Sequence, residues 1–92
     1  MHYIDTMATV KWTMRAAKQL ARLPKHDQMA VSKGVDGLEN WPACYNVKAL
    51  VGRNDFRLRV GRYRVIFTVS TSQVPVVVRI EEVKKRDEHT YQ

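Results

Sequence analysis

Residues 55–69 alternate between apolar and basic side chains, and this alternation constrains the fold more than any other feature of the sequence. The segment reads Asp-Phe-Arg-Leu-Arg-Val-Gly-Arg-Tyr-Arg-Val-Ile-Phe-Thr-Val, with the dipeptide Gly61-Arg62 near its centre. A period of two is typical of a half-buried strand, and a dipeptide is the length of a tight hairpin turn. The sequence therefore predicts a β-hairpin with one apolar face and one basic face.

The position of the turn fixes the pairing of the two strands. It predicts the pairs Val60–Tyr63, Arg59–Arg64, Leu58–Val65 and Phe56–Phe67. The apolar members then point to the core, and Arg57, Arg59 and Arg64 share the opposite face. Like charges directly opposite one another destabilise a sheet, so this arrangement indicates a face that binds an anion. The alternative is a solvated face on which arginine stems cover apolar surface.

Helical patterning precedes the hairpin. Residues 9–12 have the character of a short strand, and Thr13 follows as the expected N-cap of a helix over residues 14–23. A second helix is predicted over residues 27–39, ending before Trp41 and Pro42. The side chains expected on the inner faces of the two helices are Ala16, Ala17, Leu20, Leu23, Val31, Val35 and Leu38.

Two further strands are predicted, at residues 45–50 and 76–83. The expected fold is a compact α+β domain of residues 1–92, with residues 1–8 as an N-terminal extension. In it, an N-terminal strand and a helix pair pack on one face of an antiparallel sheet, in the order β-α-α-β-β-β, and the basic face stays open.

Charge and composition narrow the class of partner. Sixteen Lys and Arg against nine acidic residues give a formal net charge of +7, which favours polyanionic partners such as nucleic acid, ribosomal RNA or an acidic protein segment. No apolar run approaches the roughly 20 residues of a membrane span, and no signal-peptide pattern opens the chain. The single cysteine, Cys44, suits a reducing cytoplasm and is expected to be a small buried hydrophobic residue.

Familiar catalytic motifs are missing from the sequence. His2, His26 and His89 are far apart and there is no Cys-x-x-Cys, so neither a metal site nor a cofactor is predicted. Glu81 and Glu82 are neighbours on a strand and are expected to point to opposite faces.

The basic residues do suffice for one reaction, the cleavage of RNA by its own 2′-hydroxyl. Arginines would stabilise the charge on the phosphoryl oxygens, and His89, Tyr91 or a basic side chain would transfer protons. The C-terminal tail is expected to bring Arg86, His89 and Tyr91 to the basic face, with a solvated tail as the alternative. Candidate phosphate-binding residues are Lys48, Arg53, Arg59, Arg62, Lys84 and Lys85.

The run Arg-Leu-Arg-Val-Gly-Arg-Tyr-Arg-Val-Ile-Phe at residues 57–67, followed by a valine-rich strand, Lys85-Arg86 and a terminal tyrosine, resembles the RelE/ParE superfamily of bacterial toxins. These are the toxin halves of type II toxin–antitoxin modules, and the resemblance covers nearly the whole chain. It implies that Arg64 is the transition-state arginine and that Arg57, Arg86 and Tyr91 occupy further catalytic positions, with His89 as an alternative proton carrier.

The sequence departs from the RelE pattern in two places. Asp55 stands where lysine is often found, and Tyr91 is one residue nearer to Arg86 than in some members. Both departures affect which residues are assigned as the general acid and base, and they affect phosphate binding by the arginines less.

The superfamily has two branches with different functions. RelE-like members are ribosome-dependent endoribonucleases that cut mRNA in the A site, whereas ParE-like members inhibit DNA gyrase and lack nuclease activity. The presence of Arg64, Arg86 and Tyr91 favours the first branch. The resemblance implies a cognate antitoxin, the ribosome and mRNA as partners in the bacterial cytoplasm, with no membrane contact and no sequence-specific DNA binding by this chain alone.

A general RNA-binding domain is a third interpretation of the basic face. Such a domain would use exposed aromatic side chains to stack bases. Phe56, Tyr63 and Phe67 point inward in the predicted hairpin, so Tyr91 is the main stacking candidate and Tyr45 a second one.

Overall fold

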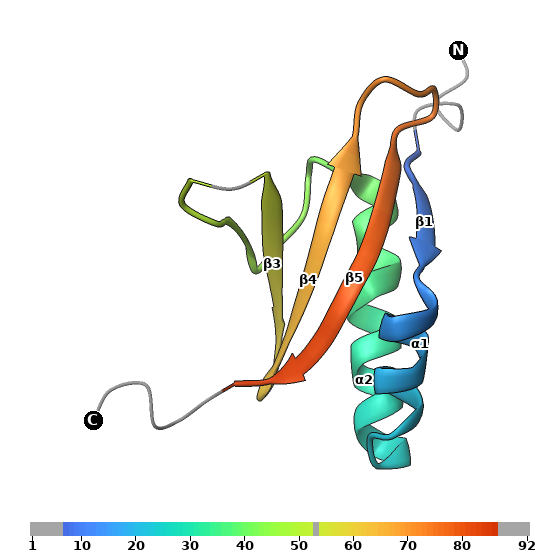
Figure 1. Ribbon diagram of the computed structural model, residues 1–92, viewed down its shortest axis with the longest axis vertical. Coiled ribbons are helices and arrows are strands. Elements are labelled where there is room, and N and C mark those ends of the chain that lie inside the picture. The colour runs from blue at the N-terminus through green and yellow to red at the C-terminus, as the bar shows by residue number, and fades with distance from the viewer. Residues whose placement is uncertain (1–6, 53, 87–92) are drawn as a thin grey trace.

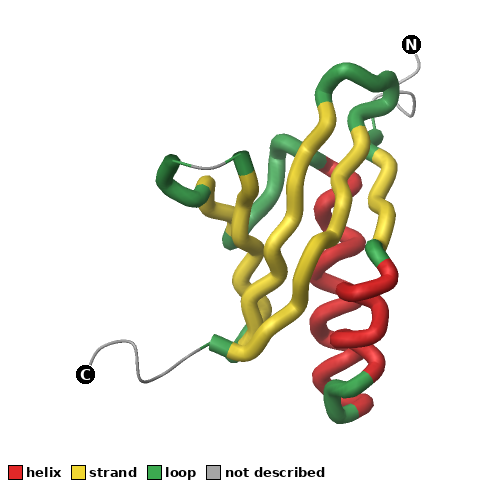
Figure 2. The backbone as a smooth tube through the Cα atoms, viewed as in Figure 1, coloured by secondary structure: helices red, strands yellow, loops and turns green. Residues whose placement is uncertain are grey.

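Two helices lie on one side of a five-stranded sheet (Figures 1 and 2). The computed structural model describes residues 7–52 and 54–86. Its elements, in chain order, are β1 (Thr9–Trp12), α1 (Met14–Ala21), α2 (Lys25–Asp36), the 3-10 helix η2 (Gly37–Asn40), β2 (Val47–Ala49), β3 (Asp55–Val60), β4 (Tyr63–Ser70) and β5 (Val77–Lys85).

The strand order across the sheet is β1-β5-β4-β3-β2. Strands β2 to β5 form an antiparallel meander, and β1 pairs in parallel with β5. α1 packs against β5 and α2 against β3, so the helices cover one face. No described helix lies on the opposite face, as Figure 2 shows.

The α+β class, the placement of the helices and all five predicted strands are confirmed, one strand more than the order β-α-α-β-β-β counts, but the sheet is mixed rather than antiparallel. The helix pair carries the chain from one edge of the sheet to the other. The meander then returns strand by strand, so β5 arrives beside β1 running in the same direction. The Thr9 N–H donates to the Val76 carbonyl (2.8 Å) and the Thr13 N–H to the Ile80 carbonyl (3.1 Å), which fixes this parallel edge.

The hairpin register is confirmed at every predicted pair. Val60 lies opposite Tyr63, Arg59 opposite Arg64, Leu58 opposite Val65 and Phe56 opposite Phe67. The inward members of this hairpin form the core with the inner faces of the helices and β5. Its largest fully buried side chains are Phe67, Leu38, Ile80, Val31, Val35, Val65 and Val78.

The helix ends follow from local chemistry. Thr13 is the N-cap of α1, since its Oγ1 accepts a hydrogen bond from the Ala16 N–H (3.1 Å) while donating to the Ile80 carbonyl (2.9 Å). α1 is shorter than predicted and ends at Ala21, before Pro24. Ala16 is buried, but Ala17 is exposed, contrary to expectation, because one residue turns a helix by about 100° and carries it off the narrow inner stripe.

Two strand boundaries also differ from expectation. β2 is only three residues long because Asn46, at φ 62°, turns the chain just before it. β5 extends to Lys85 because the whole of β4, down to Tyr63 beside the turn, pairs with it. Within the described residues, no helix is long and apolar enough to span a membrane.

α2 approaches the hairpin closely at Gly34. A Cβ atom built on Gly34 would lie 2.8 Å from Val60 Cγ2, which is below van der Waals contact. Gly34→Ala should therefore lower the free energy of unfolding, because overpacking costs about 1–3 kcal/mol and alanine returns at most about 1 kcal/mol of helix propensity. Urea unfolding followed by circular dichroism measures this difference.

Gly37 provides the matched control for this substitution. No atom lies within 4 Å of a Cβ built there, and its φ of −65° suits any L-residue. Gly37→Ala should be neutral or stabilising, by up to about 1 kcal/mol. The double variant Gly34→Ala/Val60→Ala should lose less unfolding free energy than the sum of the losses in the two single variants. If Gly34→Ala were as stable as wild type, the close approach of α2 to β3 would be contradicted.

Candidate nucleic-acid interface

The open face of the sheet carries a block of cations, which we call the arginine face and define as Lys48, Arg57, Arg59, Arg64 and Lys84. Arg59, Arg64 and Lys84 lie opposite one another on three neighbouring strands and form a continuous row. Lys48 and Arg57 form a second row, which continues into Ile66. Directly opposed residues on a sheet have Cβ atoms roughly 4.5–5.5 Å apart, so the positive charge is dense.

Ile66 is the apolar floor of this face. It points away from the core, yet only 8% of it is exposed. On its two flanks lie Arg57, its partner on β3, and Arg64, two residues earlier on β4, and both arginines are themselves half-buried. Charges over an apolar, poorly hydrated surface interact more strongly with an anion than the same charges in bulk water.

Arg57 has an unsatisfied donor. Its Nε is buried, and no hydrogen-bond acceptor for it lies in the part of the chain that the structure describes. A buried donor without a partner costs about 1–3 kcal/mol, more when it is charged. A bound anion on the guanidinium would offset part of that cost.

The acidic residues at the border of the arginine face are paired separately. A β-bulge opposite Ile66 and Phe67 breaks the strict alternation that was expected for Glu81 and Glu82. Glu81 accepts a hydrogen bond from the Thr68 hydroxyl (3.0 Å) and pairs with Arg79 (3.5 Å), whereas Glu82 pairs with Arg15 of α1 (3.3 Å). The two carboxylates therefore have different partners and do not form a dyad.

A family model supplies the decisive comparison. Residues 10–86 match the model described as ParE toxin of type II toxin-antitoxin system, parDE. This chain belongs to that family of toxins, within the RelE/ParE superfamily.

Solved structures give the ParE-family toxin a RelE-like fold. It is 30% identical to the toxin in the archaeal RelE-RelB complex from Pyrococcus horikoshii, with a TM-score of 0.75 over 89% of this chain and 98% of the other. It is 28% identical to a chain of the toxin-antitoxin complex RelBE2 from Mycobacterium tuberculosis, with a TM-score of 0.74 over 87% and 99%. The isolated Escherichia coli RelE toxin shares the fold at 17% identity, with a TM-score of 0.74 over 91% and 89%. No curated protein sequence matches the chain.

The structure brings most of the candidate residues of this toxin together at one end of the sheet. Arg57, Arg59, Arg64, Lys48 and Lys84 form the arginine face. Arg62 is exposed in the turn, and its carbonyl accepts a hydrogen bond from the Arg86 N–H (2.7 Å), which holds Arg86 beside the hairpin. Arg53, His89 and Tyr91 lie outside the described residues.

Lys85 does not join this cluster. It lies opposite Tyr63, whose side chain is buried on the helix-bearing side, while its neighbour Lys84 lies opposite Arg64. Adjacent strand residues point to opposite faces, so Lys85 lies apart from Lys84, and phosphate binding by Lys85 stays a prediction. Cys44, expected to be buried, is half-buried. Its thiol donates to the Gly37 carbonyl (3.6 Å), and desolvation raises the pKa of the thiol.

Two polar contacts that sequence reasoning missed hold the arginine-bearing strands on the helices of the toxin. The Tyr63 hydroxyl donates to Asp27 Oδ2 of α2 (2.7 Å), and Tyr63 directly precedes Arg64 in the chain. The Val83 N–H donates to Gln19 Oε1 of α1 (2.7 Å), beyond the last residue of β5 that pairs with β1. Neither contact has a local sequence signal, because each partner lies on a distant element.

Tyr63→Phe should show the contribution of the first contact as a pH dependence. The hydrogen bond to Asp27, together with burial, raises the pKa of Tyr63 above its usual value of 10.0. The contribution to stability is therefore complete below pH 10 and is lost as the pH rises through the higher folded-state pKa. The difference in unfolding free energy between wild type and Tyr63→Phe should shrink above that pH, as measured by urea unfolding at neutral and alkaline pH. A difference that stayed constant would show that the hydroxyl is not bonded to Asp27.

Proposed function

We propose that this toxin is a ribosome-dependent mRNA endoribonuclease that cuts mRNA in the A site and thereby inhibits translation. The observation that carries the proposal is the row Arg59–Arg64–Lys84, with Arg57 beside it over the apolar floor of Ile66. Three cations opposed across three strands disfavour the sheet unless an anion binds them. Arginine forks suit a phosphodiester, because they donate two parallel hydrogen bonds to phosphoryl oxygens.

The reaction that fits these groups is an internal transfer at the phosphate. The 2′-oxygen of the ribose loses its proton to a base and attacks the neighbouring phosphorus, forming a new P–O bond. The bond from phosphorus to the 5′-oxygen of the next nucleotide breaks, and that oxygen receives a proton. The products are a 2′,3′-cyclic phosphate and a 5′-hydroxyl, with no metal or cofactor in the scheme.

Different side chains stabilise the developing charge and transfer the protons. Arg64, central in its row, and Arg57 stabilise the negative charge that builds on the phosphoryl oxygens. Arg86, held at the hairpin by its backbone hydrogen bond to Arg62, contributes a further cation. Proton transfer falls to Tyr91 or His89, which follow Arg86 in the sequence. Ribosomal RNA would orient the 2′-hydroxyl in line with the leaving oxygen, and this orientation lowers the barrier further.

An antitoxin is the second partner in this proposal. The two relatives with the highest identities quoted above are toxins in complex with their antitoxins. A formal charge of +7 suits an acidic or amphipathic antitoxin segment that covers the arginine face and blocks RNA. The same charge makes RNA and ribosome binding sensitive to salt.

Inhibition of DNA gyrase is a second candidate function, and the ParE description of the matching family model favours it. In that case the arginine face is a docking surface and no bond is cleaved. Two reactions in parallel separate the candidates: translation of a reporter mRNA by purified ribosomes, and supercoiling of relaxed plasmid DNA by gyrase. The nuclease proposal predicts that translation stops, that mRNA fragments carry cyclic phosphate ends, and that supercoiling continues. Intact mRNA with arrested supercoiling would replace it with gyrase inhibition.

A further inference from the structure

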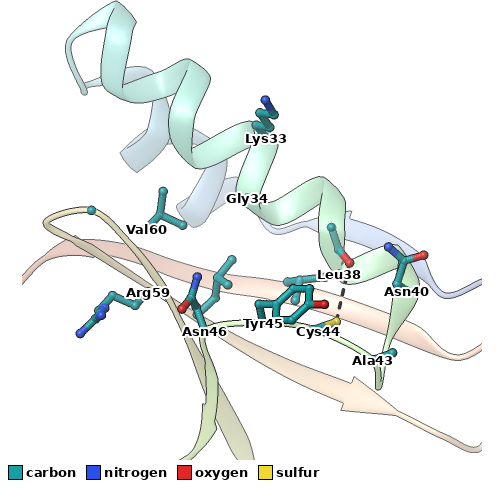
Figure 3. A pocket seen from close by; sticks show the side chains of 13 residues that line it. Lys33, Gly34, Leu38, Asn40, Ala43, Cys44, Tyr45, Asn46, Arg59 and Val60 are labelled. Atoms are coloured by element: carbon teal, nitrogen blue, oxygen red, sulfur yellow. Dashed lines mark hydrogen bonds between the residues drawn. The ribbon is translucent and has the colours of Figure 1, made fainter.

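Two of the pockets in the described part of the chain lie on opposite sides of the sheet. One, of about 420 Å³, lies on the helix-bearing side between α2–η2 and β3, with Leu58 and Val60 in its lining (Figure 3). Tyr45, the second stacking candidate, also lines this pocket and is 89% exposed. The Arg59 side chain points away from the pocket in Figure 3, so the pocket is separate from the arginine face.

The second pocket, of about 500 Å³, lies on the open side of the sheet, near the loop from β4 to β5 and far from the turn of the hairpin (Figure 1). Its polar lining includes Lys11, Thr68, Ser70, Gln73 and Arg79. Thr68 follows the buried Phe67, and Arg79 precedes the buried Ile80, so both side chains point away from the core. The pocket therefore shares its face of the sheet with Arg64, which lies four residues before Thr68 on β4.

Two cations lie side by side at this second pocket. Lys11 of β1 is the register partner of Arg79 of β5, and both residues are exposed. Paired residues on neighbouring strands point to the same face, and the strands lie about 4.8 Å apart, so the two positive charges repel each other. As at the arginine face, an anion bound between the two side chains would relieve this repulsion.

Glu81 holds Arg79 in place without using all of its donors. The Glu81 carboxylate lies 3.5 Å from Arg79 Nε and accepts a hydrogen bond from the Thr68 hydroxyl (3.0 Å), both through Oε2. The outer fork of the guanidinium, Nη1 and Nη2, has no partner within the part of the chain that the structure describes. An arginine fork donates two parallel hydrogen bonds to phosphoryl oxygens, so a phosphate in the pocket would meet a side chain that is already positioned.

The two groups of cations on the open face are separate. Thr68 lies four residues beyond Arg64 on β4, roughly 13 Å along the strand. Between them lie the uncharged Ile66 and the carboxylate of Glu81, which is the extra residue of the bulge opposite Ile66 and Phe67. Phosphates are therefore attracted to both ends of this path and repelled from its middle. An RNA strand matches this order, because uncharged nucleosides alternate with its phosphates, whereas an acidic peptide would bring carboxylates onto Glu81.

We propose that Lys11 and Arg79 form a second phosphate subsite, which binds a flanking phosphate of the same RNA strand that is cleaved at the arginine face. This inference rests on the proposed nuclease function, since it extends the site for the same substrate. The flanking phosphate lies in the pocket on the Arg79 fork, and the intervening nucleoside lies over Ile66. A strand bound at one site presents its other phosphates to the second site at high effective concentration, so the two contacts together raise the affinity.

The test is a nuclear magnetic resonance titration of the full-length toxin with 2′-O-methyl oligouridylates, which lack the attacking hydroxyl and stay intact. A hexanucleotide should shift the amide signals of Lys11 and Arg79 as well as those around Arg64. Lys11→Ala should raise the Kd of the hexanucleotide roughly 2- to 5-fold, as for one exposed ion pair. It should also reduce the slope of log Kd against log salt by about 0.7, the equivalent of one phosphate contact. The Kd of a dinucleotide, whose single phosphate binds at the larger group of cations on the arginine face, should be unchanged.

Lys18→Ala is the matched control, because it removes the same charge from an exposed position on α1, outside the open face. It should leave the Kd of the hexanucleotide close to that of wild type. Equal losses in Lys18→Ala and Lys11→Ala would overturn the subsite alone, because net charge would then explain both. Signals of Lys11 and Arg79 that respond to an oligoglutamate peptide but not to RNA would also overturn it. If Arg64→Ala left the Kd of both oligonucleotides unchanged, the arginine face would not bind RNA and the proposed function itself would fail.

Discussion

Arg64→Ala should reduce cleavage of ribosome-bound mRNA by roughly 100- to 1,000-fold, the usual effect of removing one group that stabilises transition-state charge. Arg64 lies between Arg59 and Lys84 and is only half-buried on the open face. The substitution removes no core contact and relieves repulsion with both neighbours, so the fold should be as stable as wild type or slightly more stable. Single-turnover cleavage on programmed ribosomes measures the rate, and thermal unfolding measures the stability.

Two further variants separate the contribution of the guanidinium shape at residue 64 from that of net charge. Arg64→Lys keeps the charge without the planar fork and should recover part of the lost rate. Arg22→Ala removes one positive charge from an exposed position outside the arginine face and should change the rate less than about threefold. A loss in Arg22→Ala as large as that in Arg64→Ala would show that net charge, not the geometry of the row, determines activity.

Phe67→Ala should have the largest effect on stability. The Phe67 side chain is fully buried and lies 5.5 Å from the ring of Phe56 and 5.7 Å from that of Trp41, between centroids. Truncating a buried phenylalanine costs about 3–5 kcal/mol, which is a large share of the 5–15 kcal/mol that stabilises a typical domain. The melting temperature should fall by at least about 12 °C, as measured by calorimetry or circular dichroism.

Val51→Ala is the control for this truncation. Val51 is 97% exposed, so the substitution should change the unfolding free energy by no more than about 0.5 kcal/mol. A loss below about 1 kcal/mol in Phe67→Ala would mean that the three aromatic rings do not form the centre of the core.

The hairpin could be predicted from the sequence in detail because its signals are local. Period-two alternation fixes which side chains share a face, and the two-residue turn fixes the register, so the Arg59–Arg64 pair followed directly. The same alternation places Ile66 on the basic face, although its role as the floor of that face was not recognised. Thr13 was likewise predictable as an N-cap from its side chain and position.

The features that were missed depend on residues far apart in the chain. The parallel pairing of β1 with β5 joins residues almost 70 positions apart, as in Thr9–Val77, and no local pattern encodes it. The bulge at Glu81 and Glu82 forms where β5 pairs with β4, and the same pairing extends β5 to Lys85, two residues beyond the predicted end of the strand. The Tyr63–Asp27 and Gln19–Val83 hydrogen bonds arise only after the helices pack on the sheet.

The pocket beside Tyr45 belongs to the same group. Its lining comes from α2, η2, the loop at residues 43–46 and β3. An exposed tyrosine in a sequence carries no sign that it borders a cavity, and its neighbourhood emerged only from the tertiary structure.

Primer-extension mapping of a defined mRNA on programmed ribosomes, with purified toxin and with EDTA-treated free RNA in parallel, tests the nuclease function most directly. We expect cuts at the A-site codon, no cuts in free RNA, and much weaker cuts with Arg64→Ala. Intact mRNA on the ribosome, together with inhibited supercoiling by gyrase, would contradict the proposed chemistry and make the arginine face a docking surface.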